Sequence, residues 1–541
     1  MEKSVAIQLQ GLTKVFGSVV ANNHVSLDIY KGEILSILGE NGCGKTTLMN
    51  MIAGIYYPDD GDILIDGKKV KINSPRDAYN FKIGMIHQHF KLVDVFSAVD
   101  NIILGEDLKF NNEDKKSAKT KIKKWFNFNF LAKNRGKEIK EIANKYGFDI
   151  DLDKKIYDMS VSEKQTVEII KVLYRGADIL ILDEPTAVLT PQEIKKLFNV
   201  LRKMRDDGKS IIIITHKLNE VMEISDRVAV LRKGEHIGTV ETNNTNEKAL
   251  TEMMVGQKID LNIHRSEPVN SVDRLLVKDL TVLNHEGVKV VNDVCFEAKS
   301  GEILGIAGIA GSGQRELLEA IAGLQKINKG DIIYNDPQLN TAVDLRSKTP
   351  NQIRELGVRL SFVPEDRLGM GLVGNMDIID NMMLRSYKKG HSIFLDRKSP
   401  KHLADNIVDE LHVSTPSVRT AVRKLSGGNV QKVLVGREIA ASPTVLMAAY
   451  PVRGLDINSS YTIYNLLTEQ KENGVAVIFV GEDLDVLLDL CDRIVVMCAG
   501  RVTGIVDARS ITKEEVGLLM TKTKIDNEAK EEKALWSKQK K

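Results

Sequence analysis

The segment that most constrains this chain is the loop Gly39-Glu40-Asn41-Gly42-Cys43-Gly44-Lys45-Thr46-Thr47. It fills every fixed position of the pattern G-x-x-x-x-G-K-[ST]. Residues 32–38 before it have the pattern of a short buried strand, and residues 46–53 after it have the pattern of a helix. Between a strand and a helix, such a loop points backbone N–H groups at phosphate oxygens. We therefore predict a phosphate-binding loop in which Lys45 reaches the β- and γ-phosphates and the Thr46 hydroxyl binds Mg²⁺.

The chain repeats itself over most of its length. The run Gly-Glu-Ile-Leu at residues 32–35 returns at residues 301–304, an offset of 269 residues, and Asp226-Arg227 returns as Asp492-Arg493, an offset of 266 residues. A repeat of this period predicts two homologous domains of about 260 residues each. The predicted boundaries are a first domain at 1–256, a linker at 257–273, a second domain at 274–523 and a charged tail at 524–541.

Within each repeat, short apolar runs alternate with helical patterns. Residues 179–182 and 211–214 are such runs, rich in isoleucine and leucine. Apolar strands alternating with helices are typical of a buried, largely parallel sheet. We therefore predict the α/β fold class for both domains.

Composition separates the possible classes of function. The 541 residues include 76 Lys and Arg and 74 Asp and Glu, a formal net charge of +2. Such a balance creates no global field that favours nucleic acid. The four cysteines form no close-spaced disulfide or zinc pattern, as in a reducing cytosol. No run approaches the roughly 18 apolar residues of a membrane span, and the first residues lack a signal-peptide core. We expect a soluble cytosolic protein that reaches a membrane only through a partner.

Three more residues of the first repeat fit ATP hydrolysis. The strand pattern at 179–182 leads into Asp183 and Glu184, carboxylates suited to holding Mg²⁺ and to orienting or deprotonating water. His216 follows the strand pattern at 211–215 and is a candidate for contact with the γ-phosphate. A helix cap and a structural histidine are the alternative interpretations. The order and spacing of the residues favour the functional one.

Two further candidates lie nearer the N-terminus. Gln88 is a candidate for sensing the metal and the attacking water from a mobile loop. Phe16 is a candidate for stacking on adenine, with a core position as the alternative. His87 and His89 flank Gln88, but a pair of histidines without further ligands is a weak metal site.

With these motifs, the chain resembles a tandem ATP-binding-cassette (ABC) ATPase, which carries two P-loop nucleotide-binding domains in one polypeptide. It is similar to the ATPases that energise bacterial importers of simple sugars and nucleosides. The resemblance rests on the family's signature motif Leu-Ser-Gly-Gly-Asn-Val-Gln at 425–431, on Asp-Glu-Pro-Thr at 183–186 and on Thr-His-Lys-Leu at 215–218. It covers nearly the whole chain. It implies that each domain combines a mostly parallel core sheet with an antiparallel β subdomain and a helical subdomain.

The second repeat lacks the residues of catalysis. Gln314 stands in place of the loop lysine, and Arg315 in place of the hydroxyl. Ala449 and Tyr450 replace the two carboxylates, and Glu482 occupies the position of the histidine. Losing one charge-stabilising donor alone costs about 10²–10³ in rate. We predict that this repeat does not hydrolyse ATP at a useful rate, while its glycines leave nucleotide binding open.

The signature motifs show the opposite bias. The resemblance implies that each ATP lies between the phosphate loop of one domain and the signature of the other. The second repeat has the intact signature and the adjoining loop aspartate, Asp456. In the first repeat, Ser162 replaces the second glycine of the signature, and Thr190 occupies the position equivalent to Asp456. We therefore predict one hydrolytic site and one degenerate site.

The predicted hydrolytic site draws on both repeats and uses ATP and Mg²⁺. Its predicted catalytic residues are Lys45, Gln88, Glu184 and His216, and its predicted metal ligands are Thr46, Gln88 and Asp183. The predicted nucleotide contacts are Phe16, Gly39, Glu40, Asn41, Gly42, Cys43, Gly44, Lys45, Thr46, Thr47, Ser426, Gly427, Gly428 and Asp456.

The resemblance also implies the partners. We expect an energy-coupling subunit, peripheral to the cytoplasmic face of the cell (inner) membrane through permease subunits. An extracytoplasmic solute-binding protein would act indirectly, and no nucleic acid is expected. The predicted permease contact is the helical subdomain between Gln88 and Ser160. Its charged stretch at 106–141, with a basic and aromatic run at 121–130, is interpreted as a solvated elaboration; lipid headgroups or RNA are the alternative ligands.

The imported solute is the least constrained feature. Residues 85–90, 186–193 and 364–367 resemble the nucleoside-type branch of these importers, with ribose, xylose or galactose as the alternative. The rival class is a soluble tandem ATPase that acts on ribosomes or nucleic acid. Tyr450 in place of a catalytic glutamate and the short linker argue against it.

Overall fold

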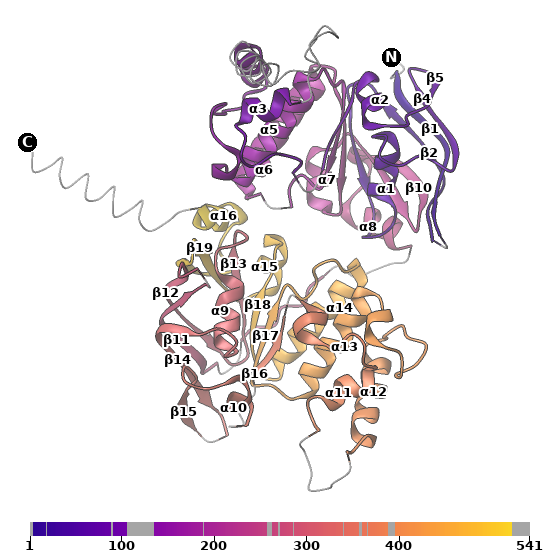
Figure 1. Cartoon of the computed structure of the whole chain (residues 1–541). Coiled ribbons are helices and arrows are strands. Elements are labelled where there is room, and N and C mark those ends of the chain that lie inside the picture. The colour runs from indigo at the N-terminus through magenta and orange to yellow at the C-terminus, as the bar shows by residue number, and fades with distance from the viewer. Residues whose placement is uncertain are drawn as a thin grey trace, which may run out of the picture. The chain divides into compact units, whose positions relative to one another are not determined.

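The computed structural model describes most of the chain as two compact units, Met1–Ile259 and Asp260–Lys541 (Figure 1). The division falls inside the junction expected at 257–273. The described residues are 4–17, 19–87, 90–104, 135–187, 189–256, 262–268, 271–284, 286–338, 340–355, 360–364, 366–387 and 395–521. The basic and aromatic run at 121–130 and the tail at 524–541 lie outside them.

The first unit is built on a six-stranded sheet with the order β10-β9-β3-β8-β7-β6, in which only β10 runs antiparallel to its neighbour. Every residue of β3, β7 and β8 is buried, because helices cover both faces of a parallel sheet. The strands are β3 Ile34–Leu38, β6 Ile83–Ile86, β7 Ile179–Asp183, β8 Ser210–Thr215, β9 Arg227–Arg232 and β10 Glu235–Glu241.

Adjacent strands of this sheet end at the same edge. Leu38 at the end of β3 pairs with Thr215 at the end of β8, and Asp183 at the end of β7 pairs with Ile214. The residues that follow these strands therefore meet at one carboxyl edge. The helices with defined bounds in the described part of the unit are α1 Lys45–Ile52, α2 Pro75–Asn80, α3 Ala98–Ile103, α5 Val161–Tyr174, α6 Pro191–Asp206, α7 Leu218–Ile224 and α8 Glu247–Val255, with single 3₁₀ turns at Ile156–Asp158 and Thr242–Asn244. Residues 135–146 are also helical.

A four-stranded antiparallel sheet packs on α1. Its order is β2-β1-β4-β5, and its alternate residues, such as Ile7 and Leu9 of β1, are buried against Leu48 and Ile52 of α1. In Figure 1 this sheet and the helices α3 and α5 lie at opposite sides of the unit. The strands are β1 Val5–Phe16, β2 Val19–Tyr30, β4 Asp60–Ile65 and β5 Lys68–Val70. The first unit thus has the predicted core sheet, antiparallel subdomain and helical subdomain.

The second unit repeats this architecture. Its sheets have the orders β16-β17-β18-β13-β19-β20 and β12-β11-β14-β15, which match those of the first unit strand for strand. The strands are β11 Asp273–Leu283, β12 Lys289–Lys299, β13 Ile303–Gly308, β14 Ile327–Asp336, β15 Thr341–Asp344, β16 Leu360–Val363, β17 Val445–Ala449, β18 Ala476–Val480, β19 Arg493–Cys498 and β20 Arg501–Asp507. The helices are α9 Gln314–Ile321, α10 Pro350–Glu355, α11 Ile378–Met383, α12 Lys398–Glu410, α13 Gly427–Ala440, α14 Ile457–Glu472, α15 Leu484–Leu490 and α16 Lys513–Thr521, with a π-helical turn at Arg367–Gly371 and a 3₁₀ turn at Val422–Lys424.

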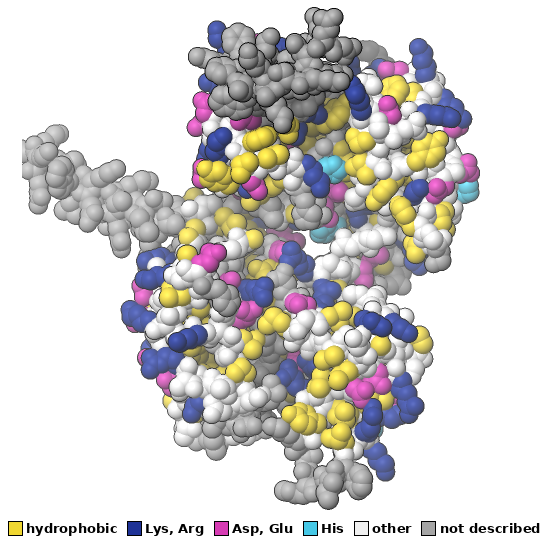
Figure 2. All heavy atoms as spheres, viewed as in Figure 1, with side chains coloured by type: hydrophobic (Ala, Val, Ile, Leu, Met, Phe, Trp, Pro, Cys, Tyr) yellow, Lys and Arg dark blue, Asp and Glu magenta, His cyan; other side chains and the backbone are white. Residues whose placement is uncertain are grey.

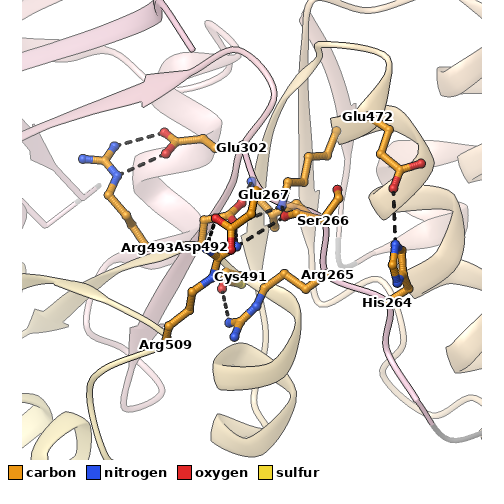
Figure 3. A network of polar contacts seen from close by, with 12 residues as sticks. His264, Arg265, Ser266, Glu267, Glu302, Glu472, Cys491, Asp492, Arg493 and Arg509 are labelled. Atoms are coloured by element: carbon orange, nitrogen blue, oxygen red, sulfur yellow. Dashed lines mark hydrogen bonds and ion pairs between the residues drawn. The ribbon is translucent and has the colours of Figure 1, made fainter. Parts of the chain in front are cut away.

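Part of the junction between the units belongs structurally to the second unit. Residues 262–268 contact a buried ion pair between Lys471 Nζ and Asp492 Oδ1, 2.8 Å apart, with side chains 1% and 6% exposed. Arg265 donates to the carbonyl of Cys491 at 2.8 Å (Figure 3). These contacts fix the junction segment on the second unit. Throughout the described ranges, every helix falls short of the length and apolar character needed to cross a membrane.

Candidate nucleotide site

The predicted phosphate-binding loop lies between β3 and α1, in the strand–loop–helix order that the sequence predicts. Gly44 caps the N-terminus of α1 with φ 98°, and a Cβ atom there would lie 2.2 Å from the carbonyl oxygen of Ala21. Only glycine tolerates both the left-handed backbone and this close approach. The glycine lets the chain turn tightly into α1, so that the N–H groups of the first turn face the loop.

Lys45 is the first residue of α1, and its side chain folds back onto the preceding loop. Its side chain is buried, and Nζ donates to the carbonyl oxygens of Gly39 at 2.6 Å and Glu40 at 2.9 Å. Cys43 Sγ lies 4.0 Å from the same ammonium group. Burial raises the pKa of the Cys43 thiol, against the opposing effect of Lys45, so the thiol is neutral at pH 7. The loop thus concentrates one positive charge where phosphate oxygens are expected.

Two of the predicted metal ligands meet beside the loop. The hydroxyl of Thr46 donates to Oδ1 of Asp183 at 3.4 Å. Burial raises the pKa of Asp183, and the bond from Thr46 partly offsets this effect. Gln88, the third predicted ligand, lies outside the described residues. Across the described part of the chain, no cluster of three or more His, Cys, Asp or Glu side chains is arranged for a metal ion.

Glu184 and His216 form a pair at the same edge of the sheet. His216 Nδ1 and Glu184 Oε1 are 3.0 Å apart. This hydrogen bond lowers the pKa of Glu184, against the effect of burial, so the side chain is ionised at neutral pH. A carboxylate of lowered pKa is a weak base, and it is better suited to orienting a water molecule than to removing its proton early.

Contacts that the sequence does not predict hold the turn after β7. Gln165 Nε2 donates to the carbonyl oxygen of Pro185 at 2.8 Å, and the Thr186 hydroxyl donates to Glu220 Oε2 at 2.5 Å. Glu168 accepts from the backbone N–H of Lys91 at 2.5 Å, in the segment that follows Gln88. The only sequence signal for Gln165 is that a glutamine, Gln431, recurs at the same place in the second repeat.

The signature motif of the second unit begins a helix. Ser426 is the N-cap of α13, which starts with Gly427, and Asp456 is the N-cap of α14. A Cβ atom on Gly428 would lie 2.9 Å from the hydroxyl of Ser459, the residue whose N–H Asp456 accepts at 2.8 Å. The two predicted nucleotide-contacting loops of this unit are therefore packed together.

Helix capping is common to both repeats. Ser160 and Thr190 are the N-caps of α5 and α6 in the first unit, as Ser426 and Asp456 are in the second. Capping accounts for the serines without any nucleotide. The two repeats differ in the residues after the capping serine. Two glycines follow Ser426 and leave the N-terminus of α13 without bulky side chains, whereas valine and serine follow Ser160.

Charge on the visible surface is mixed. In Figure 2, lysine and arginine side chains are interspersed with acidic ones on the face shown, and no continuous basic stripe is seen among the described residues. A protein that tracks nucleic acid typically concentrates its positive charge on one face. The face shown has no such feature.

Comparisons with known proteins agree with this geometry. A family model described as ABC transporter matches residues 22–187 and 291–451. The chain is 42% identical to the guanosine import ATP-binding protein NupO of Bacillus subtilis (strain 168), over 95% of this chain and 97% of the relative. It is 40% identical to the nucleoside import ATP-binding protein NupA of Lactococcus lactis subsp. cremoris (strain MG1363), over 96% and 99%. It is 34% identical to the ribose import ATP-binding protein RbsA of Clostridium tetani (strain Massachusetts / E88), over 95% and 97%.

One solved structure resembles both units together. It is the archaeal ribosome recycling factor aABCE1 in complex with the ribosomal stalk protein aP1, with a TM-score of 0.56 and 16% identity over 92% of this chain and 90% of that one. At this identity the likeness concerns the fold alone.

Proposed function

Because this chain belongs to the ABC transporter family of ATP-binding proteins, we propose that it hydrolyses ATP to drive the import of nucleosides. The observation that carries ATP hydrolysis in this proposal is that five of the predicted catalytic and metal-binding side chains lie at one edge of the first unit. Asp183, Glu184 and His216 lie at the carboxyl ends of β7 and β8. Lys45 and Thr46 begin α1, directly after the loop that follows β3.

The described side chains have distinct roles in this proposal. Lys45 exchanges the carbonyls of Gly39 and Glu40 for phosphate oxygens, because charged acceptors form the stronger bonds. Thr46 and Asp183, with Gln88, supply the hard oxygen ligands that Mg²⁺ prefers. A bound Mg²⁺ neutralises charge on the phosphate oxygens. Glu184 orients the attacking water, His216 holds Glu184 and faces the γ-phosphate, and adenine stacks on Phe16.

The distribution of motifs between the repeats supports a shared site. We propose that Ser426, Gly427, Gly428 and Asp456 complete the nucleotide site of the first domain when ATP is bound. The degenerate loop of the second domain then pairs with the altered signature around Ser162. In this scheme ATP stabilises a closed state and hydrolysis releases it, which is a population shift between two conformations.

The partners follow from the same proposal. The ATPase acts with membrane permease subunits, which hold it at the cytoplasmic face of the cell membrane, and an extracytoplasmic binding protein delivers the solute. The helical subdomain is the proposed permease contact. Nucleosides are favoured because the relatives named for guanosine import and nucleoside import are 42% and 40% identical to this chain. A relative named for ribose import is 34% identical. Ribose, xylose or galactose is the alternative solute.

Reconstitution tests the solute directly. The ATPase, its permease and its binding protein are placed in proteoliposomes, and phosphate release is measured with guanosine, uridine, ribose, xylose or galactose. We expect stimulation by nucleosides. Thermal denaturation of the binding protein gives a second measurement, because a ligand at 100 times its Kd adds about 2.7 kcal/mol of stability. Stimulation and stabilisation by a sugar, with none by any nucleoside, would move the protein to the sugar alternative.

A further inference from the structure

We propose that Lys14, Tyr56 and Asp59 are positioning residues that hold Phe16 as the stacking platform for the adenine base. This inference rests on the proposed function of the first site. Phe16 is the last residue of β1 and is 43% exposed, although it is a large aromatic side chain. An exposed aromatic ring at the end of a strand needs neighbours to fix its orientation before a base can stack on it.

Two side chains contact the ring directly. The ammonium of Lys14 lies over the Phe16 ring, 5.4 Å from its centroid. The ring of Tyr56 crosses that of Phe16 at 72°, with centroids 5.3 Å apart. The first contact is a cation–π interaction, and the second is an edge-to-face aromatic pair. The cation occupies one face of the ring, so a base would stack on the other.

Asp59 fixes both the cation and the backbone before the ring. Lys14 Nζ donates to Asp59 Oδ1 at 3.0 Å and to the carbonyl oxygen of Tyr57 at 2.7 Å. Asp59 Oδ2 accepts from the backbone N–H of Val15 at 2.7 Å. The Lys14 side chain is only 14% exposed, so it is packed in place and does not move freely in solvent. Lys14, Tyr56 and Asp59 are therefore connected with Phe16 in one arrangement around its ring.

The second repeat provides an internal comparison. Val15 pairs with Val20 in the first unit as Leu283 pairs with Lys289 in the second, which aligns the ends of β1 and β11. In this alignment the second repeat has the replacements Val282 for Lys14, Asn284 for Phe16, Gln325 for Tyr56 and Asn328 for Asp59. All four residues differ in the repeat that also lacks the catalytic lysine and carboxylates.

One contact survives this loss. Asn328 Oδ1 accepts from the backbone N–H of Leu283 at 3.1 Å, as Asp59 accepts from Val15. The tie to the strand end is therefore needed for the fold of either repeat. The cation and the two aromatic rings are not, because β11 and β12 pair as far as Leu283 and Lys289 without them. Their presence together in the catalytic repeat points to the nucleotide.

Binding of two ligands to the full-length protein separates base contacts from phosphate contacts. Dissociation constants are measured by calorimetry for ATP and for inorganic tripolyphosphate, each with Mg²⁺. Phe16→Ala is expected to raise the Kd for ATP about fivefold or more, since stacking on a base is lost. Lys14→Met is expected to raise it about two- to tenfold. Neither should change the Kd for tripolyphosphate. Tyr56→Phe should bind ATP as the parent does, whereas Tyr56→Ala should bind it more weakly.

A matched control lies on the same sheet. Lys69 forms an exposed ion pair with Asp62, away from the ring, so Lys69→Met should leave both dissociation constants unchanged. Lys14→Arg retains a cation for the ring and should recover most of the affinity lost in Lys14→Met. Far-UV circular dichroism and thermal denaturation show whether each variant is folded. If Lys14→Met does not fold, the two Tyr56 variants make the same test.

The outcomes separate this inference from the proposed function. Equal losses for ATP and tripolyphosphate in Lys14→Met would mean that the ammonium acts on phosphate, which overturns the inference. Unchanged ATP affinity in folded Lys14→Met and Tyr56→Ala, with a loss in Phe16→Ala, would also overturn it, because Phe16 would need no support. Tripolyphosphate binding that survives Lys45→Ala would instead contradict the proposed site, whatever the Lys14 result.

Discussion

The two repeats share a backbone and differ in chemistry. Glu184 follows β7 with φ 47°, and Tyr450, at the same place after β17, has φ 49°. Each donates its N–H to the neighbouring strand, Glu184 to Ile214 at 2.9 Å and Tyr450 to Val480 at 2.8 Å. A left-handed conformation at a bulky residue often marks a catalytic group. Here it persists without the carboxylate, so it belongs to the fold.

Individual replacements preserve contacts and remove charge. Gln314 donates to the carbonyl of Ile309 at 3.3 Å, the bond that Lys45 makes with Glu40 in the first repeat. Arg315, in place of Thr46, is paired with Glu319 on its own helix at 2.7 Å. The second loop is therefore a well-packed structure without the ammonium and hydroxyl that phosphate and Mg²⁺ require.

The largest expected effect comes from Glu184, the only carboxylate at this position in either repeat. Glu184→Gln keeps the shape of the side chain and removes its charge, so steady-state ATP hydrolysis should fall by about 10²–10³-fold while ATP binding remains. Phosphate release and nucleotide binding are measured on the same preparation. Hydrolysis at the parent rate in a single turnover would contradict the assignment.

The reverse substitution tests the second repeat. Tyr450→Glu restores one carboxylate at a position with the required backbone, but Gln314 and Ala449 still replace the loop lysine and the first carboxylate. It should add no measurable hydrolysis to the Glu184→Gln protein. A double variant that recovers activity would show that the second repeat lacks only this group.

A smaller effect is expected at the signature motifs. Gly427→Asp places a negative charge where the γ-phosphate is proposed to lie, and turnover should fall by about 10²-fold. Among the described residues, a Cβ atom at Gly427 would meet a guanidinium nitrogen of Arg367, 3.1 Å away, and the end of this flexible side chain would have to shift by a few tenths of an ångström. Ser162→Asp in the first repeat should have a much milder effect. Equal losses in both variants, at matched amounts of folded protein, would reject the proposed pairing of motifs.

The ion pairs behind the two sheets give a comparison of stability. Lys471 and Asp492 are buried under the junction segment, whereas Arg205 and Asp226, at the same place in the first repeat, have side chains 28% and 30% exposed. Lys471→Met should lower the free energy of unfolding by about 3 kcal/mol, because a buried carboxylate loses a partner. Arg205→Met should cost at most about 1 kcal/mol. Urea denaturation measures both, and a larger loss in Arg205→Met would show that burial does not decide the difference.

Local motifs were predictable from sequence, and contacts between distant segments were not. The loop at 39–47, Asp183 and Glu184 were predictable because a contiguous pattern fixes both the backbone and the chemistry of each. The hydrogen bond from His216 to Glu184 follows from two neighbouring strands ending at one edge. The bond from Gln165 to the Pro185 carbonyl depends on how α5 packs on the sheet, and no spacing encodes that packing.

The platform around Phe16 shows the same limit. The ring itself was predicted, but Lys14 meets Asp59 across a gap of 45 residues, through the pairing of β1 with β4. Either residue alone has an ordinary surface pattern. The comparison of repeats could have identified them, since Val282 and Asn328 occupy their places in the second copy.

The smallest expected effect uses Cys43, which lies in the first loop where the second has Ser312. Alkylation at this position therefore reports on the first loop alone. The thiol is buried and its pKa is raised, and only the thiolate reacts, so alkylation should be slow at pH 7 and should accelerate as the pH rises. MgATP should slow it further, by about threefold or more, because the bound phosphates fill the loop. Cys295 is exposed and lies in the other repeat, so its labelling should not depend on nucleotide. Mass spectrometry of both peptides gives the two rates in one experiment. If MgATP protected Cys295 and Cys43 equally, the protection would reflect a global change, and the comparison of the two loops would lose its support.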